Sequence, residues 1–184
     1  MIIKHLTFSD LSFYNKTIPM IKEGHTRVEF DNNSMIIQTE VNPFKIDMSA
    51  HETPSDWIKI LNPETTQITV IEINGQLVAG AITVTHSPKC NMLRNNMGNA
   101  VLWDIRVHPK FQNKGYASLL IKNSLQYAKK QNCTQLLIET QDNNPKAIQF
   151  YIKHGAKLLD VNTEIYDKDL NETQFIFTIS IKMN

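Results

Sequence analysis

The sequence has little of what marks membrane, secreted or disordered proteins. It contains two cysteines, six glycines and seven prolines among 184 residues. No apolar run approaches the roughly 20 residues that a membrane-spanning helix needs. The first ten residues lack an apolar signal core followed by small residues. We therefore expect a cytoplasmic protein with no membrane partner, whose Cys90 and Cys133 remain free thiols.

The chain also has little net charge, +1, which argues against a dedicated nucleic-acid binder. The charge is unevenly distributed, because residues 1–104 carry a net −3 and residues 105–184 a net +4. An acidic half beside a basic half suits a cationic substrate and an anionic cofactor. A solvated surface with uneven charge would give the same count, so charge alone leaves both interpretations open.

The first third of the chain gives the weaker secondary-structure signals. The expected elements there are a strand at 2–6, a helix capped by Ser9 or Asp10, a strand at 35–41, a short helix from Ser55 or Asp56 to Ile60, and Asn-Pro turns at 42–43 and 62–63. No repeat or low-complexity linker divides this part from the rest.

The remainder of the chain alternates strands and helices. We expect strands at 68–73, 76–85, 101–107, 135–140, 157–166 and 174–182, and helices at 116–131 and from Asn144-Pro145 to about His154. Asn74-Gly75 is a strong hairpin signal between the first two of these strands. The order predicts a mixed α/β sheet with helices on its faces.

The segment from Val101 to Ala117 carries the clearest chemical signal. A strand ends, a tight loop follows and a long helix begins, so the loop presents the unpaired N–H groups and positive dipole of a helix start. Gly115 allows close approach of a phosphate, and Lys110 and Lys114 add positive charge. The pattern is neither a nucleotide P-loop nor a dinucleotide fingerprint. An ordinary strand–helix turn whose glycine relieves strain is the alternative.

Two spaced motifs resemble the acetyl-CoA signature of the GNAT superfamily of N-acetyltransferases. The first is Gln112-x-x-Gly115-x-Ala117, which follows a strand ending Ile105-x-Val107-x-Pro109; the second is Asn144-x-x-Ala147-x-x-Phe150-Tyr151-x-x-x-Gly155. The stretch Glu139-Thr-Gln-Asp-Asn-Asn144, with Phe150-Tyr151 and then Val161-x-Thr163-x-x-Tyr166, further resembles the streptothricin acetyltransferases within that superfamily. The resemblance covers residues 67–182.

The resemblance implies the GNAT fold, a mixed and mostly antiparallel sheet that is splayed at its centre and flanked by helices. It implies one domain over residues 1–184, with 1–66 as the acceptor-side part and 67–184 as the core that binds acetyl-CoA. Acetyl-CoA would be the co-substrate, and no histidine pair has the spacing of metal ligands, so we expect no metal. The molecule would be a monomer or a homodimer.

The resemblance also assigns residues to the cofactor. Backbone groups of Ile105, Arg106 and Val107 would pair with the pantetheine arm like an added strand. Asn144 would form a hydrogen bond to that arm. The loop that would hold the diphosphate, chiefly through backbone N–H groups, comprises Gln112, Asn113, Lys114, Gly115, Tyr116, Ala117 and Ser118.

Amide formation from a thioester requires a neutral amine, a stabilised oxyanion and a protonated leaving thiolate. Tyr151 is the predicted acid, with a satisfied, half-buried helix aromatic as the alternative interpretation. A backbone N–H near Ile105 is the predicted oxyanion donor. Asp104 is the predicted base, acting through water, or equally the partner of Arg106 across the pleat. Glu139 and the carboxylates of residues 31–72 are weaker candidates for the base.

Trp103 stands where the resembling streptothricin enzymes carry a second carboxylate. The predicted activity is transfer of an acetyl group to a primary amine of a small cationic acceptor, for example a streptothricin-type antibiotic. A protein or peptide N-acetyltransferase is a second possibility. A module that binds acetyl-CoA without turnover and a structural α/β domain without a cofactor are the alternatives from other classes.

Overall fold

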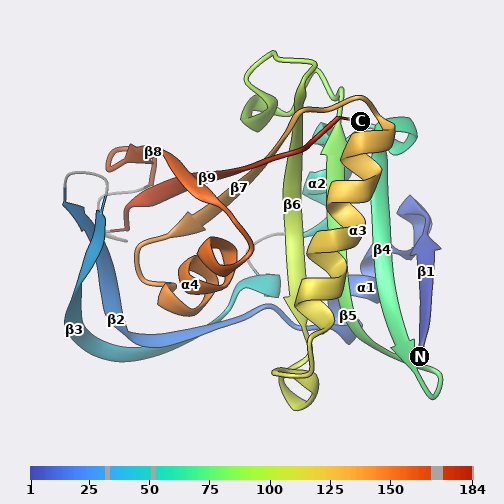
Figure 1. The fold of residues 1–184 in the computed structure, drawn as a ribbon. Helices are drawn as coiled ribbons and strands as arrows, with labels where there is room; N and C mark the ends of the chain where they lie inside the picture. The colour runs from blue at the N-terminus through green and yellow to red at the C-terminus, as the bar shows by residue number, and fades with distance from the viewer. Residues whose placement is uncertain (32–33, 51–52, 167–171, 184) are drawn as a thin grey trace. The chain divides into compact units, whose positions relative to one another are not determined.

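The computed structural model describes residues 1–31, 34–50, 53–166 and 172–183 (Figure 1). The chain forms two compact units that interleave along the sequence. The first unit comprises Met1–Ile21, Asp47–Leu137 and Ser180–Asn184, and the second comprises Lys22–Ile46 and Ile138–Ile179. None of the four boundaries between the units coincides with residue 66, and the expectation of a single domain stays a prediction.

The strands of the described chain are β1 (Ile2–Leu6), β2 (Ile21–Asp31), β3 (Ser34–Asp47), β4 (Thr66–Ile73), β5 (Gln76–Thr85), β6 (Asn99–Val107), β7 (Gln135–Gln141), β8 (Lys157–Asn162) and β9 (Gln174–Ser180). The helices are α1 (Leu11–Thr17), α2 (Pro54–Ile60), α3 (Tyr116–Lys130) and α4 (Pro145–Lys153).

In the first unit, the strands follow the order β1-β4-β5-β6-β7, and the pairs from β1 to β6 are antiparallel. The β4–β5 hairpin turns at Asn74 and Gly75, whose φ angles of 50° and 80° are those a tight hairpin turn requires. β7 begins in this unit, where the N–H groups of Thr134 and Gln135 donate to the Gly98 carbonyl.

Helices cover both faces of β5, which explains why nine of its ten residues are buried. Thr83 on β5 forms a buried hydrogen bond to Ser124 of α3, at 2.8 Å. Gly80 contacts the ring of Tyr14 of α1. Because successive residues of a strand face opposite sides, the contacts of Gly80 and Thr83 lie on opposite faces of the sheet.

In the second unit, the end of β7 is followed in strand order by β9 and then β8, while β2 and β3 form a separate two-stranded sheet. We call that two-stranded sheet, β2–β3, the arm. The arm packs on β9 through Phe30, whose ring lies edge-on to Phe175 at 4.9 Å between centroids. The Val28 N–H donates to the Asp142 carbonyl beyond the end of β7, at 2.8 Å.

The fold class is confirmed as a mixed α/β protein with a large, mostly antiparallel sheet flanked by helices. Two local predictions were wrong, and one strand was missed. Asn42-Pro43 lies within β3 and is no turn; both strands of a two-stranded sheet are edge strands, where proline is tolerated. β2 was not predicted at all, and the strand expected at 157–166 ends at Asn162. Within the described residues, no helix has the length and apolar character required to cross a membrane.

Candidate active site

The predicted diphosphate loop is built as the start of a helix. β6 ends at Val107, a 3-10 turn covers Pro109–Phe111, and α3 begins at Tyr116. Gly115 is the N-cap, with φ of 81°, a left-handed conformation that glycine adopts at no steric cost. The N–H groups of the first helical turn have no carbonyl partner within the helix, so they face outward at its positive end.

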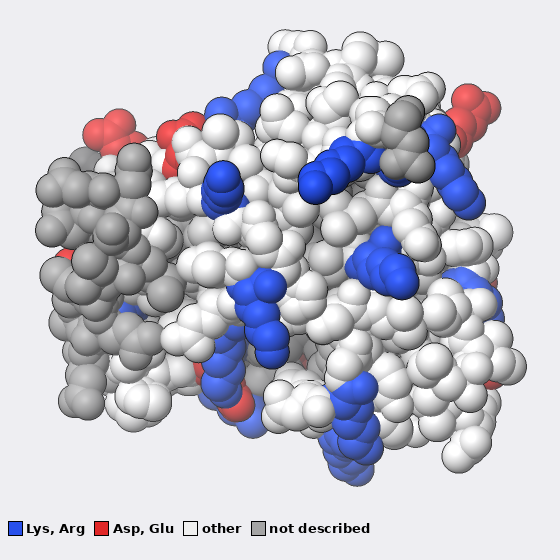
Figure 2. Space-filling view, viewed as in Figure 1, with Lys and Arg blue, Asp and Glu red and all other residues white. Residues whose placement is uncertain are grey.

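The surroundings of this loop suit an anion. Residues Gln112 to Gly115 are exposed, and a Cβ built on Gly115 would meet no atom within 4 Å. The ammonium of Lys114 lies 5.1 Å from the centre of the Phe111 ring, which holds it beside the loop. Figure 2 shows basic side chains standing over the part of the view where α3 and the loop before it lie, with acidic ones mostly at the margins. The residues therefore fit a bound diphosphate.

β6 carries a bulge that was not predicted from the sequence. Its pairing with β5 shifts from Ile82–Asp104 to Thr83–Leu102, so Trp103 is an extra residue opposite no partner. A bulge bends the strand and interrupts its ladder, and such bulges are common beside active sites. The bulge directly precedes Asp104 and Ile105, the stretch predicted to supply the oxyanion donor.

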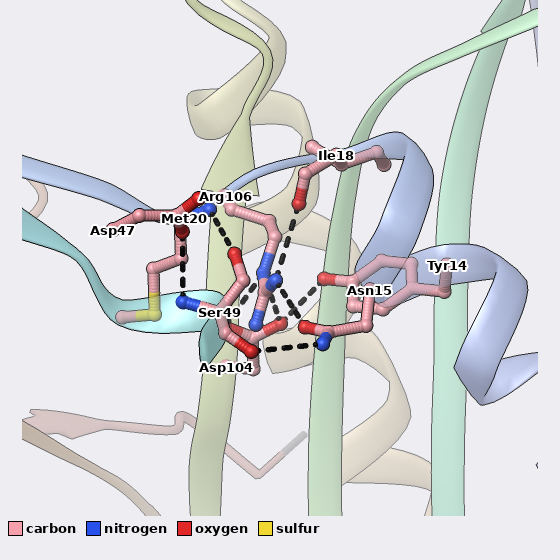
Figure 3. A network of polar contacts seen from close by, with 8 residues as sticks. All are labelled: Tyr14, Asn15, Ile18, Met20, Asp47, Ser49, Asp104 and Arg106. Carbon is pink, nitrogen blue, oxygen red and sulfur yellow. Dashed lines mark hydrogen bonds and ion pairs between the residues drawn. The ribbon is translucent and has the colours of Figure 1, made fainter. Parts of the chain in front are cut away.

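Asp104 lies in a buried polar network, which Figure 3 shows. Its carboxylate accepts hydrogen bonds from Nε of Arg106 at 2.9 and 3.1 Å and from the Tyr14 hydroxyl at 2.5 Å. The side chains of Asp104 and Arg106 are each only 2% exposed. The sequence left Asp104 as either the base or the partner of Arg106, and the structure shows that the pairing with Arg106 is present.

The rest of this network comes from α1 and its surroundings. Tyr14 is fully buried, and burial followed by the charge of Asp104 raises the pKa of its hydroxyl well above the ordinary value. The guanidinium of Arg106 lies 5.1 Å from the Tyr14 ring centre and 5.6 Å from that of Trp57. A Cβ on Gly80 would come within 2.3 Å of the Tyr14 ring, so glycine is required where this ring crosses β5.

The second unit contains Asn144 and Tyr151. Asn144 caps α4, and its Oδ1 accepts the N–H of Ala147 at 3.3 Å. Tyr151 is 6% exposed on that helix, and its ring lies edge-on to Phe150 at 5.5 Å. The structure thus places Asn144 at the N-cap of α4 and Tyr151 within this helix, as the Asn-Pro start and the Gly155 stop predicted.

Glu139, one of the weaker base candidates, is also in the second unit and is half-buried. Its Oε1 accepts a hydrogen bond from the Tyr166 hydroxyl at 2.7 Å, and that hydroxyl accepts one from Gln141 at 3.0 Å. Burial, and then the Glu139 charge, raise the pKa of Tyr166 far above its ordinary value. Tyr166 therefore stays protonated and acts as a donor to Glu139.

Among the carboxylates of residues 31–72, two that the structure describes pair with surface lysines. Asp56 binds Lys59 at 2.9 Å, and Glu72 binds Lys4. The side chains of Asp31, Glu40 and Glu52 lie outside the described residues. Across the residues that are described, no group of three or more histidine, cysteine or carboxylate side chains is placed to hold a metal ion.

The predicted site residues are thus distributed over both units. Ile105–Val107 and the loop of residues 112–118 belong to the first unit, while Asn144, Tyr151 and Glu139 belong to the second. Sequence reasoning missed Tyr14, whose signal is weak because a tyrosine in a short amphipathic helix usually indicates packing. It also missed the bulge at Trp103, for which the sequence carries no turn residue.

A fold of this class, with a glycine-led helix start after a bulged central strand, matches a known family. The model of the acetyltransferase (GNAT) family matches residues 35–156, and the chain therefore belongs to that family. It is 35% identical over 75 residues to streptothricin acetyltransferase A of Bacillus subtilis (strain 168). That match covers 40% of this chain and 43% of the relative, so it spans less than half of the relative's length.

Solved structures share the fold over almost the whole chain. A Bacillus anthracis (strain Ames) protein assigned as a streptothricin acetyltransferase, in complex with acetyl coenzyme A, has a TM-score of 0.76 at 20% identity, with 98% of each chain covered. A nourseothricin acetyltransferase has a TM-score of 0.74 at 15% identity, again with 98% of each covered. The ribosomal-protein-S18-alanine N-acetyltransferase of Escherichia coli has 0.66 at 19%, with 100% of this chain and 95% of that one covered.

Proposed function

We propose that this protein transfers the acetyl group of acetyl-CoA to a primary amine of a small cationic acceptor, and that a streptothricin-type antibiotic is such an acceptor. The observation that supports this reaction most directly is the left-handed conformation of Gly115 at the start of α3, in a chain of the acetyltransferase (GNAT) family. The match to the B. subtilis streptothricin enzyme supports the acceptor.

In this proposal, the start of α3 binds the diphosphate through its N–H groups, with Lys110 and Lys114 nearby. Ile105, Arg106 and Val107 offer backbone groups to the pantetheine arm. Because Oδ1 of Asn144 is already used to cap α4, its side-chain NH₂ is the group that would donate to the cofactor. Acetyl-CoA supplies the thioester carbon that the amine attacks.

The reaction needs an acid for the thiolate, a donor for the oxyanion and a base for the amine. The Tyr151 hydroxyl would protonate the departing thiolate, and a backbone N–H near Ile105, just beyond the bulge, would stabilise the oxyanion. For the amine proton, Asp104 acting through water and Glu139 remain candidates. The hydrogen bonds from Arg106 and Tyr14 favour a structural role for Asp104, whereas Glu139 is half-buried and accepts a hydrogen bond from Tyr166.

The proposal is tested by following CoA thiol release from purified protein and acetyl-CoA. The acceptors are streptothricin, polyamines, aminoglycosides and peptides with free N-termini, each at several concentrations. We expect saturable release with streptothricin and little with peptides. Release with peptides alone would replace the small acceptor by a protein terminus. Binding of acetyl-CoA without release from any acceptor would favour the non-catalytic alternative.

The role of Tyr151 is tested by Tyr151→Phe, which removes the hydroxyl and keeps the ring. We expect kcat to fall about 100-fold, within the usual contribution of a general acid, while the Kd for acetyl-CoA changes less than about twofold. Tyr127→Phe, on α3, is the matched control and should leave kcat unchanged. A Tyr151→Phe enzyme with wild-type kcat would remove this residue from the mechanism.

A further inference from the structure

The two ends of the arm are fastened to one another within the first unit. β2 begins at Ile21 and β3 ends at Asp47, so the chain leaves and re-enters the first unit at these points. There the Met48 N–H donates to the Met20 carbonyl at 2.8 Å, and the Met20 N–H donates to Oγ of Ser49 at 2.7 Å. We call residues 18–20 and 47–49 the roots of the arm.

Arg106 holds both roots, one directly and the other through Asn15 (Figure 3). Nη1 of Arg106 donates to the Ile18 carbonyl at 3.1 Å and to Oδ1 of Asn15 at 2.8 Å. Nδ2 of Asn15 then donates to the Ser49 carbonyl at 3.1 Å. Asn15 therefore bridges the buried guanidinium to one root, and Arg106 reaches the other directly.

Arg106 is fixed by its pairing with Asp104, so both roots are tied to β6. Charge-assisted hydrogen bonds that are shielded from water are the stronger and more directional ones. A buried ion pair is weak evidence for stability, because its desolvation cost offsets much of its attraction. A buried polar network of this kind can also select one arrangement of the segments that it binds.

The middle of the arm supports the loop from which α4 starts. Besides the Val28 N–H, the guanidinium of Arg27 contacts Oδ2 of Asp142 at 3.2 Å. Asp142 lies two residues before Asn144, the cap of α4, and the same helix carries Tyr151. Within the first unit the roots of the arm are therefore held by Arg106 of β6, and within the second unit the middle of the arm contacts the residues just before α4.

We propose that the Arg106–Asn15–Ser49 network is a positioning device for catalysis, with Asn15 and Ser49 as positioning residues. It holds the roots of the arm, and the arm supports the start of the helix that carries the proposed acid. This inference rests on the proposed function for its effect on turnover. Displacement of a catalytic group by about 1 Å can cost about 100-fold in rate, so loosened roots would lower kcat without changing the diphosphate loop.

The test compares Asn15→Ala and Ser49→Ala with Thr83→Val. Asn15→Ala removes the two hydrogen bonds by which Asn15 joins Arg106 to the Ser49 carbonyl, and Ser49→Ala removes the bond between the Met20 N–H and Oγ of Ser49. Thr83→Val removes the buried Thr83–Ser124 hydrogen bond of the same unit. Amide hydrogen exchange is measured over residues 21–31 and 142–148, together with kcat and the Kd for acetyl-CoA. For Asn15→Ala and Ser49→Ala we expect exchange over both segments to be about 10-fold faster and kcat about 10-fold lower, with Kd within about twofold. Thr83→Val should change neither kcat nor exchange in these segments.

Unchanged exchange over residues 21–31 in both network variants would overturn the positioning device. So would equal acceleration in Thr83→Val, because the effect would then be general destabilisation. Hydrogen exchange needs no acceptor, so it shows whether the network holds the arm even if no turnover is found. Failure of the proposed function would instead appear as absence of acetylation by the wild-type protein.

Discussion

Tyr14, Asp104 and Arg106 show how far single residues can be interpreted from sequence. Asp104 and Arg106 are two positions apart on one strand, so they share a face, and their contact was foreseeable as one of two alternatives. Tyr14 lies 90 positions from Asp104, and nothing local to it indicates a buried donor to a carboxylate. The requirement for Gly80 likewise becomes clear only when the ring that crosses it is known.

Tyr14 gives a prediction for the pH dependence of stability. Burial and Asp104 raise its pKa in the folded protein above the ordinary 10.0, so above about pH 10 the unfolded chain loses a proton that the folded chain keeps. The free energy of unfolding must then fall with rising pH, by up to about 1.4 kcal/mol per pH unit from this group. Below pH 10 the contribution is fully present.

Tyr14→Phe removes this proton and also one hydrogen bond to a buried carboxylate. We expect the variant to be less stable at pH 7 by about 1–3 kcal/mol, and its stability to fall less steeply than that of the wild type above pH 10. Urea unfolding of both proteins at pH 7, 9, 10 and 10.5 measures the difference. Parallel pH curves would show that the Tyr14 hydroxyl is not shifted.

At the scale of elements, regular local patterns were predicted well and long-range pairings were not. α3 and the β4–β5 hairpin carry their own signals in apolar periodicity and in Asn74-Gly75, and both form as expected. β2 contains Gly24 and charged residues with no clear alternation, so its pairing depends on β3 and on the second unit. The bulge in β6 likewise depends on register with β5, which no local pattern encodes.

The start of α3 gives a prediction at this scale. Gly115→Ala forces a left-handed alanine, which costs about 1–2 kcal/mol, and adds a methyl group where a phosphate would approach. We expect the Kd for acetyl-CoA to rise about 10-fold, equivalent to 1.4 kcal/mol of binding free energy. Isothermal titration calorimetry measures it.

Gly75→Ala is the matched control, because Gly75 has nearly the same φ, 80° against 81°, and equally open space around its Cβ position. It should lower stability by a similar amount and leave the Kd unchanged. An equal rise of Kd in both variants would show that strain, and not the phosphate approach, weakens binding.

At the scale of the whole molecule, the chain passes from the first unit to the second and back twice before it ends. This interleaving is set by contacts between segments far apart in sequence, such as Val28 with Asp142, and no compositional boundary marks it. The family and fold could be predicted because two motifs lie at a fixed spacing in the part of the chain whose secondary-structure signals are clear. The arm and the network at its roots could not be predicted, because the residues that contact them are far apart in the sequence.

Transfer of an acetyl group from acetyl-CoA to an amine is the reaction proposed for this protein. The most direct measurement is the mass of streptothricin after incubation with the protein and acetyl-CoA, with samples lacking either one as controls. We expect streptothricin to gain one acetyl group only in the complete mixture, and Tyr151→Phe to slow this gain. If streptothricin, polyamines, aminoglycosides and peptides all stay unmodified under conditions where acetyl-CoA is bound, the protein does not catalyse this transfer.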